Sequence, residues 1–273
     1  MNTKPRYTLK HSDARVIEIP QSVDPEELDT TAPTKPIIVF VFGKGGVGKT
    51  QTAQAALIAM REAGHEVIGI DADASNSSLK RQVPQSILLD MGDPSAVIHN
   101  LELLIIEHVF QNCRSLVIDT GGGSDKAIRQ WFAAPTVQNV YANEGVQIVA
   151  LTVIDSSLDA ASHVMETVDS MPGTKHALVM NLGHTPGTIG ERAFQPLMND
   201  PEFRAYVHRM PKIVMPRLPD AVELDTWGAR LHTINDKTSP AKHNPFVVGR
   251  TKNWLSDMST ALSQIFENSS TIN

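Results

Sequence analysis

A glycine-rich stretch with two lysines carries the clearest chemistry in this sequence. Residues 43–50 read Gly-Lys-Gly-Gly-Val-Gly-Lys-Thr and match the spacing G-x-x-x-x-G-K-[ST] of a phosphate-binding loop. Glycine at 45, 46 and 48 allows positive φ and a close approach of the backbone to a polyphosphate, whose oxygens the N–H groups then face. Lys49 would reach the β- and γ-phosphates, and the Thr50 hydroxyl would ligate Mg²⁺. We therefore expect this chain to bind a nucleoside triphosphate, and the expected contacts are Gly45, Gly46, Val47, Gly48, Lys49 and Thr50.

Polar side chains end several apolar segments of the chain. These residues are Asp71, Asp119, Asp155 and Asn181. In an open parallel sheet the ligand lies beyond the carboxyl ends of the strands. We therefore expect these four side chains to lie near the phosphate loop.

The elements that must position these residues alternate between strand and helix. Apolar runs predict strands at 37–42, 66–70, 86–89, 115–118, 147–153, 176–180 and 213–215. Helical spacing and end signals predict helices at 50–63, 93–110, 157–171, 220–229 and 245–267. This alternation predicts an α/β fold, a doubly wound and mostly parallel sheet flanked by helices, as in P-loop NTPases.

The chain divides by composition near residue 36. Residues 1–36 hold five prolines and an acidic cluster, so we expect an extended or partly ordered arm with at most one short strand at Arg15–Ile19. Residues 37–273 are expected to form the P-loop domain, including the C-terminal helix.

Overall composition narrows the class of protein. The sequence has 273 residues, a formal net charge of −6, no run of 18 apolar residues and no apolar signal core, so we expect a cytoplasmic protein. Its single cysteine, Cys113, allows neither an internal disulfide nor a cysteine-rich metal site within one chain. We expect Cys113 to be buried as a small apolar side chain.

The second lysine of the loop indicates a particular family. Residues 44–50, from Lys44 to Thr50, resemble the deviant Walker A signature of the ParA/MinD family of ATPases. In that family the early lysine reaches across a dimer interface to the nucleotide of the other subunit. The resemblance implies that Lys44 acts in trans, that ATP brings two copies together, and that Mg²⁺-dependent hydrolysis yields ADP and phosphate. Lys44, Lys49 and Asp73 are then the expected catalytic residues.

Two acidic motifs extend the resemblance. Residues 71–75 resemble the family's switch I motif, with Asp71 near Mg²⁺ and Asp73 orienting the attacking water; capping of a turn is the alternative for both. Residues 116–119 resemble a Walker B strand whose Asp119 holds Mg²⁺ through water. The expected metal residues are therefore Thr50, Asp71 and Asp119. The following segment, 120–123, departs from the family's usual Asp-x-Pro-x-Gly because three glycines follow Thr120.

The base site is expected from two later segments. Asn181 matches a family asparagine that contacts adenine, and residues 215–222 resemble a proline-containing loop that packs against the base. We carry over Asn181, Pro216, Leu218 and Pro219 as cofactor contacts. An ordinary strand-end turn is the alternative for Asn181.

What the sequence lacks excludes some branches of the family and disfavours another. One cysteine is too few for an iron–sulfur or zinc-clasping branch, and no tyrosine cluster stands near the C-terminus. A MinD-like membrane-cycling ATPase needs a basic amphipathic C-terminal helix, but residues 253–273 contain no Lys or Arg. We therefore expect this helix to pack on the domain or on a second subunit, and membrane binding is not expected.

What remains is a ParA-like switch ATPase of plasmid partition, stability or conjugative transfer. Residues 201–252 carry nine Lys/Arg against five acids, so residues 204–252 are a candidate contact for DNA or a DNA-bound partner protein. A solvated face is the alternative. Three other functions stay open: an ATP-dependent ligase or synthetase acting on a small carboxylate, a membrane-cycling MinD-like positioning ATPase, and a nucleotide-binding scaffold without hydrolysis.

Overall fold

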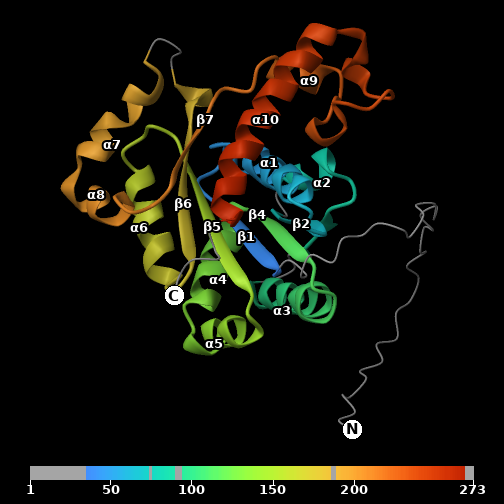
Figure 1. Ribbon diagram of the computed structural model, residues 1–273. Coiled ribbons are helices and arrows are strands. Elements are labelled where there is room, and N and C mark those ends of the chain that lie inside the picture. The colour runs from blue at the N-terminus through green and yellow to red at the C-terminus, as the bar shows by residue number, and fades with distance from the viewer. Residues whose placement is uncertain (1–34, 74–75, 90–93, 186–188, 268–273) are drawn as a thin grey trace. The chain divides into compact units, whose positions relative to one another are not determined.

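Seven runs of apolar and β-branched residues form one parallel sheet at the centre of the computed structural model (Figure 1). The strands are β1 (Ile37–Phe42), β2 (Val67–Ala72), β3 (Ile87–Leu88), β4 (Ser115–Thr120), β5 (Gln147–Ile154), β6 (Lys175–Asn181) and β7 (Lys212–Met215). Their order is β3-β2-β4-β1-β5-β6-β7, and every pairing is parallel. All seven predicted strands are present, and the predicted fold class is confirmed. The structure describes residues 35–73, 76–89, 94–185 and 189–267.

Helices cover both faces of the sheet because neighbouring strand residues point to opposite sides. On one face Val39 and Val41 pack with α1 (Lys49–Glu62), α9 (Ala221–Thr226) and α10 (Pro245–Glu267). On the other face Phe40 and Phe42 pack with the second group of helices. This group comprises α3 (Pro94–Leu104), the π-helix Ile105–Gln111, α4 (Gly122–Phe132) and α5 (Pro135–Glu144).

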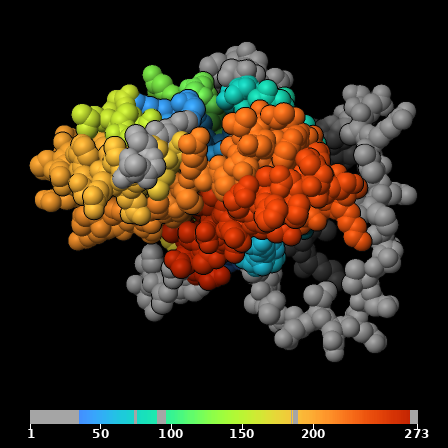
Figure 2. Space-filling model, turned by 90° about the horizontal axis from the view of Figure 1, so that it is seen from above, coloured from blue at the N-terminus to red at the C-terminus, as the bar shows by residue number. Residues whose placement is uncertain are grey.

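The β6–β7 side of the sheet has its own core. It is covered by α6 (Ala160–Ser170), α7 (Gln195–Asn199) and α8 (Pro201–Val207), with Phe194, Leu197 and Phe203 fully buried. The short helices α2 (Ser78–Gln82), Leu182–His184, Gly190–Phe194, Leu231–Thr233 and Pro240–His243 complete the described elements. Figure 2, the view from above, shows blue atoms from the start of the domain at the surface beside green and orange segments from later in the chain.

The C-terminal helix packs on its own domain, as expected. Trp254, Met258 and Leu262 are buried, and α10 lies against α1. Trp254 Nε1 also donates a hydrogen bond to the Pro216 carbonyl, at 2.8 Å. None of the helices in the described part of the chain is long and apolar enough to cross a membrane.

Some predictions are wrong or fall outside the described residues. The helices α4 and α5 were not predicted, and the predicted helix 93–110 changes to a π-helix at Ile105. Cys113 is exposed rather than buried, and its φ of 54° turns the backbone just before β4 begins at Ser115. The strand predicted at Arg15–Ile19 and nearly all of the predicted arm, 1–36, lie outside the described residues. The division of the chain at residue 36 therefore stays a prediction.

Candidate nucleotide site

The phosphate loop connects β1 to the first turn of α1, and three of its glycines have positive φ. Gly43, Gly46 and Gly48 have φ of 146°, 79° and 99°, whereas Gly45 keeps an ordinary φ, contrary to the prediction. A side chain at Gly43 would meet the Val153 carbonyl oxygen at 2.5 Å, and one at Gly48 would meet Asn181 Nδ2 at 2.5 Å. Both glycines are thus required by backbone conformation and by close packing.

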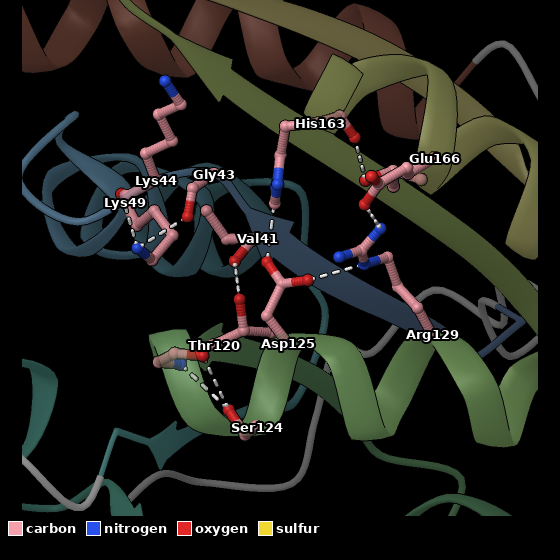
Figure 3. A network of polar contacts seen from close by, with 12 residues as sticks. Val41, Gly43, Lys44, Lys49, Thr120, Ser124, Asp125, Arg129, His163 and Glu166 are labelled. Carbon is pink, nitrogen blue, oxygen red and sulfur yellow. Dashed lines mark hydrogen bonds and ion pairs between the residues drawn. The ribbon is translucent and has the colours of Figure 1, made fainter. Parts of the chain in front are cut away.

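Lys49 is nearly buried inside the loop that precedes it. Only 9% of the residue is exposed, and its Nζ donates to the carbonyls of Gly43 (2.9 Å) and Lys44 (2.8 Å) (Figure 3). Burial lowers the pKa of Lys49, and the carboxylates of Asp119, Asp125 and Asp73 oppose this shift. An ammonium held among loop carbonyls is placed to exchange them for phosphate oxygens.

Thr50 and Asp119 form the centre of the predicted metal site. The Thr50 hydroxyl donates to Asp119 Oδ2 at 2.6 Å, and Asp119 pairs with Asp71 in the register of β2 and β4. Burial raises the pKa of Asp119 to about 7, the hydrogen bond from Thr50 lowers it, and the nearby Asp71 raises it further. A buried carboxylate of this kind is poorly stabilised without a cation.

This donor set fits Mg²⁺. The described residues contain no cluster of three His, Cys, Asp or Glu side chains that would form an all-protein cage. Mg²⁺ does not need one, since it typically takes one or two protein oxygens together with phosphates and water.

Asp71 serves the backbone of the segment that follows it. Its Oδ1 accepts from the Asp73 amide at 3.0 Å and its Oδ2 from the Lys80 amide at 2.8 Å. Asp71 therefore holds the turn between β2 and α2, which matches the turn-capping alternative. A role of Asp71 near the metal stays a prediction.

Asp73 lies against the turn that follows β4. An added Cβ at Gly121 would fall 2.7 Å from Asp73 Cα, Cβ and Cγ. The Asp73 carboxylate also acts electrostatically on both Lys49 and Asp119. Two of the three predicted catalytic residues, Lys49 and Asp73, therefore belong to one site.

Lys44 leaves the loop in a different direction from Lys49 (Figure 3). It forms an ion pair with Asp159, which stands just before α6; the side chains are 31% and 72% exposed. The neighbouring Leu158 is 69% exposed. Lys44 is thus at the surface, whereas Lys49 is the lysine whose ammonium lies inside the phosphate loop of the same chain.

The residues predicted for the base do not come together as a group. Asn181 is buried under the loop, where Nδ2 donates to the Val47 carbonyl (2.7 Å) and Oδ1 accepts from the Gly183 amide (2.7 Å). Leu218 lines a cavity of about 320 Å³ that also includes Thr50. Pro216 and Pro219 do not line this cavity.

Gln54 is a further residue of this cavity that was not predicted. It lies on α1 and is buried, and among the described residues its Oε1 has no hydrogen-bond partner. The helical spacing of Thr50 and Gln54, one turn apart, could have placed it next to the loop.

Asp155, the fourth polar strand end, does not line this cavity. Its Oδ1 accepts hydrogen bonds from the amide and the hydroxyl of Ser157 and so shapes the turn after β5.

A partly buried ionic network next to the loop was also not predicted. Asp125 Oδ1 accepts from Arg129 Nε at 2.6 Å, and its Oδ2 lies 3.3 Å from His163 Nε2 (Figure 3). Arg129 continues the network to Glu166 at 2.9 Å. The Asp125–Arg129 pair has i,i+4 helical spacing, but it falls in α4, which was not predicted.

The parallel sheet, the loop with its enclosed lysine and the Thr50–Asp119 pair together define a P-loop nucleotide-binding protein. The chain belongs to the family of the CobQ/CobB/MinD/ParA nucleotide binding domain, whose family model matches residues 38–263. The predicted relationship to ParA/MinD-type ATPases is confirmed.

Two comparisons add detail. The chain is similar to "Protein MobD" of Acidithiobacillus ferrooxidans, with 25% identity over 209 residues that cover 72% of this chain and 84% of that protein. Its fold is similar to that of the septum site-determining protein MinD complexed with Mg-ADP from Pyrococcus horikoshii OT3. That match has a TM-score of 0.52 and 15% identity, and it covers 87% of this chain and 100% of that one.

Proposed function

We propose that this protein is a Mg²⁺-dependent ATPase that works as an ATP-dependent dimerising switch in plasmid partition, stability or conjugative transfer. The observation that carries the proposal is the contrast between the two loop lysines. Lys49 is enclosed in its own site, whereas Lys44 is held at the surface by Asp159. One lysine is suited to the chain's own nucleotide and the other to the nucleotide of a second copy.

Binding of the phosphates uses groups that already converge. Lys49 Nζ exchanges the carbonyls of Gly43 and Lys44 for β- and γ-phosphate oxygens, and the amides of Gly45 to Thr50 surround the phosphates. Thr50 and Asp119 would hold Mg²⁺, with Asp71 beside Asp119 in the sheet. When bound, Mg²⁺ would supply charge neutralisation for the phosphates and for the buried carboxylates.

Hydrolysis depends on an aligned water and on neutralised charge rather than on a covalent intermediate. Asp73 accepts a hydrogen bond from the attacking water and orients it toward the γ-phosphate. Lys44 of a second copy neutralises charge on the oxygen that leaves, in the manner of an arginine finger.

We assign the adenine and ribose to the cavity that begins at Thr50. Leu218 and Leu224 give it an apolar side, and Gln54 Oε1, which no described residue bonds, can accept a hydrogen bond from an amino group. Asn181 holds the phosphate loop in place through its hydrogen bond to the Val47 carbonyl. Pro216 and Pro219 flank Leu218 in the loop that carries it.

Dimerisation is supported by the surface around Lys44. Gly45, Gly46 and Leu158 are all exposed beside it. Exposed glycine backbone and a large apolar side chain next to a catalytic lysine are what a face-to-face dimer would cover.

The test measures the mass of the protein in solution with ATP, with ADP and without nucleotide, together with phosphate release. We expect a dimer with ATP only, and slow release. Lys44→Ala should bind ATP yet stay monomeric, whereas Lys35→Ala, which removes an exposed lysine at the opposite end of β1, should behave as the wild type. Phosphate release that requires a small carboxylate would instead support a ligase or synthetase, and ATP binding without phosphate release would support a scaffold.

A contact with DNA is proposed through the basic segment 204–252. Three exposed lysines, Lys237, Lys242 and Lys252, line one cavity between Pro240–His243 and α10. Arg250 and Lys212, by contrast, are engaged with Asp220 and with backbone carbonyls. Lys237→Glu, Lys242→Glu and Lys252→Glu together should weaken DNA binding with ATP and Mg²⁺ and reduce its salt dependence. Salt-independent binding by the wild type would contradict this contact.

A further inference from the structure

A buried hydroxyl strengthens the contact between the turn after β4 and the end of β2, where the Gly121 amide also donates to the Ala72 carbonyl at 3.3 Å. Ser124 is fully buried in the first turn of α4. Its Oγ donates to the Ala72 carbonyl at 2.6 Å and accepts from the Gly121 amide at 2.9 Å (Figure 3 shows Ser124 and its neighbour Thr120). The residue after Ala72 is Asp73, so this hydroxyl joins the two turns that face the phosphates.

The packing of Gly121 against Asp73 explains why this turn has glycine where the family's usual Asp-x-Pro-x-Gly motif has proline. Gly121 has φ of −92° and ψ of 166°, which other residues can adopt, so conformational freedom does not require glycine here. Packing does, because a Cβ at this position would lie 2.7 Å from three atoms of Asp73. A proline ring would displace Asp73, and the bond from Ser124 supplies the restraint that a proline would otherwise give.

The start of α4 is itself held in place. Asp125, next to Ser124, is buried and bonded to Arg129 on its own helix, and it faces His163 on α6. Arg129 reaches Glu166, also on α6. The Ser124 hydroxyl is therefore attached to a helix that is fixed against its neighbour.

We propose that Ser124 is a positioning residue for hydrolysis: by joining Gly121 to Ala72 it holds Asp73 over the phosphate site. This inference rests on the proposed ATPase function. Ser124 touches no phosphate in this scheme and acts through Asp73. The groups that bind nucleotide, Lys49 and Thr50, belong to a different segment and keep their partners without the hydroxyl.

The first test is the kinetics of Ser124→Ala against Ser115→Ala. Ser115 is an equally buried serine at the opposite end of β4, where its hydroxyl accepts from the Ile37 amide at 3.1 Å. We expect Ser124→Ala to lower kcat roughly tenfold, since small misplacements of a reacting group are costly, with KM and the affinity for an ATP analogue unchanged. Ser115→Ala should lower the melting temperature similarly and leave kcat unchanged. Equal kcat values for the two variants would overturn the proposal.

A second variant perturbs the same contact from the other side. Gly121→Ala leaves the Ser124 hydroxyl in place but pushes on Asp73, so it should reproduce the loss of kcat. Gly249→Ala, where an added Cβ meets nothing within 4 Å, is the matched control. Normal kcat in Gly121→Ala would contradict the role of this contact.

A double-mutant cycle identifies the route of the effect. If Ser124 acts through Asp73, then Ser124→Ala should have no further effect on kcat in an Asp73→Ala background. Additive losses would show that Ser124 acts elsewhere and would overturn the proposal.

Amide hydrogen exchange separates this inference from the proposed ATPase function. Ser124→Ala, and not Ser115→Ala, should raise exchange at the amides of Asp73 and Lys80. If the wild type releases no phosphate, the ATPase proposal fails, while the exchange pattern still decides whether Ser124 positions Asp73. Unchanged exchange at both amides would reject the positioning role.

Discussion

Without metal, the Asp119→Asn variant should gain unfolding free energy relative to the wild type as the pH rises. The Asp119 carboxyl is buried, and burial raises its pKa from 3.8 to about 7. Between these two values the folded chain keeps a proton that the unfolded chain has lost. The stability that this proton contributes is fully present below pH 3.8 and is lost as the pH rises through about 7. Asparagine has the same shape, can accept the hydrogen bond from Thr50, and never ionises.

The size of the effect follows from the two pKa values. A gap of about three pKa units corresponds to about 4 kcal/mol of unfolding free energy once both states are ionised. Between pH 5 and pH 8 the advantage of Asp119→Asn over the wild type should grow by about 2.5 kcal/mol, because only part of the gap is crossed in that interval.

The assay is urea unfolding of both proteins at pH 5 and pH 8, with a chelator present. Other titrating groups cancel in the difference between the two proteins. Asp257→Asn, which removes an exposed carboxylate from α10, is the control and should shift stability by less than about 0.5 kcal/mol at either pH. A stability difference for Asp119→Asn that stays constant between pH 5 and pH 8 would refute the reasoning. Addition of Mg²⁺ with nucleotide should then stabilise the wild type and not Asp119→Asn.

Three further variants test separate parts of the site. Lys49→Ala should abolish nucleotide binding, measured by titration with a fluorescent ATP analogue; binding within tenfold of the wild type would contradict the role of this ammonium. Asp73→Ala should bind ATP and dimerise but release phosphate slowly, so that the dimer persists; rapid release would exclude Asp73 as the residue that orients water. Asp125→Asn should lower the unfolding free energy by about 2 kcal/mol at pH 7, because it removes the buried carboxylate that bonds Arg129 and leaves Arg129 only the exposed Glu166 as a charged partner. Although burial raises the pKa of Asp125, His163 and Arg129 outweigh it and hold that pKa below 3.8. The difference should therefore persist above pH 4 and shrink as the pH falls through the lowered pKa, a trend that unfolding curves at several pH values would reveal.

The phosphate loop and the sheet could be predicted because their signals are local. Fixed spacing defines residues 43–50, and continuous apolar runs define buried parallel strands. The exception inside the loop, Gly45, shows the limit of this reasoning. The spacing predicts a glycine-rich loop but not which glycines are required. The structure shows this for Gly43 and Gly48, which pack against Val153 and Asn181.

Other parts of the site depend on contacts between distant segments. Three glycines at 121–123 are typical of a turn, yet α4 begins at Gly122. Its first turn is held by Ser124, which bonds the Ala72 carbonyl at the end of β2, and by Asp125, which faces His163 on α6. Asn181 ends its strand as predicted, but only the fold shows that its amide is already bonded to Val47 and Gly183.

The surface position of Lys44 bears on how readily two copies could close. Its partner Asp159 is largely exposed, and an ion pair in that setting contributes about 0–1 kcal/mol. Releasing Lys44 toward a neighbouring nucleotide therefore costs little, and a single charge-assisted hydrogen bond to phosphate, worth about 1.5–3 kcal/mol, offsets it. Lys49 is different, because its ammonium is buried between two carbonyls and gains a replacement partner only when phosphate enters. For the proposed dimer, these magnitudes predict that nucleotide binds first and the two copies close second. Lys44 is easily released, but it has no phosphate to contact until Lys49 of the other copy holds one.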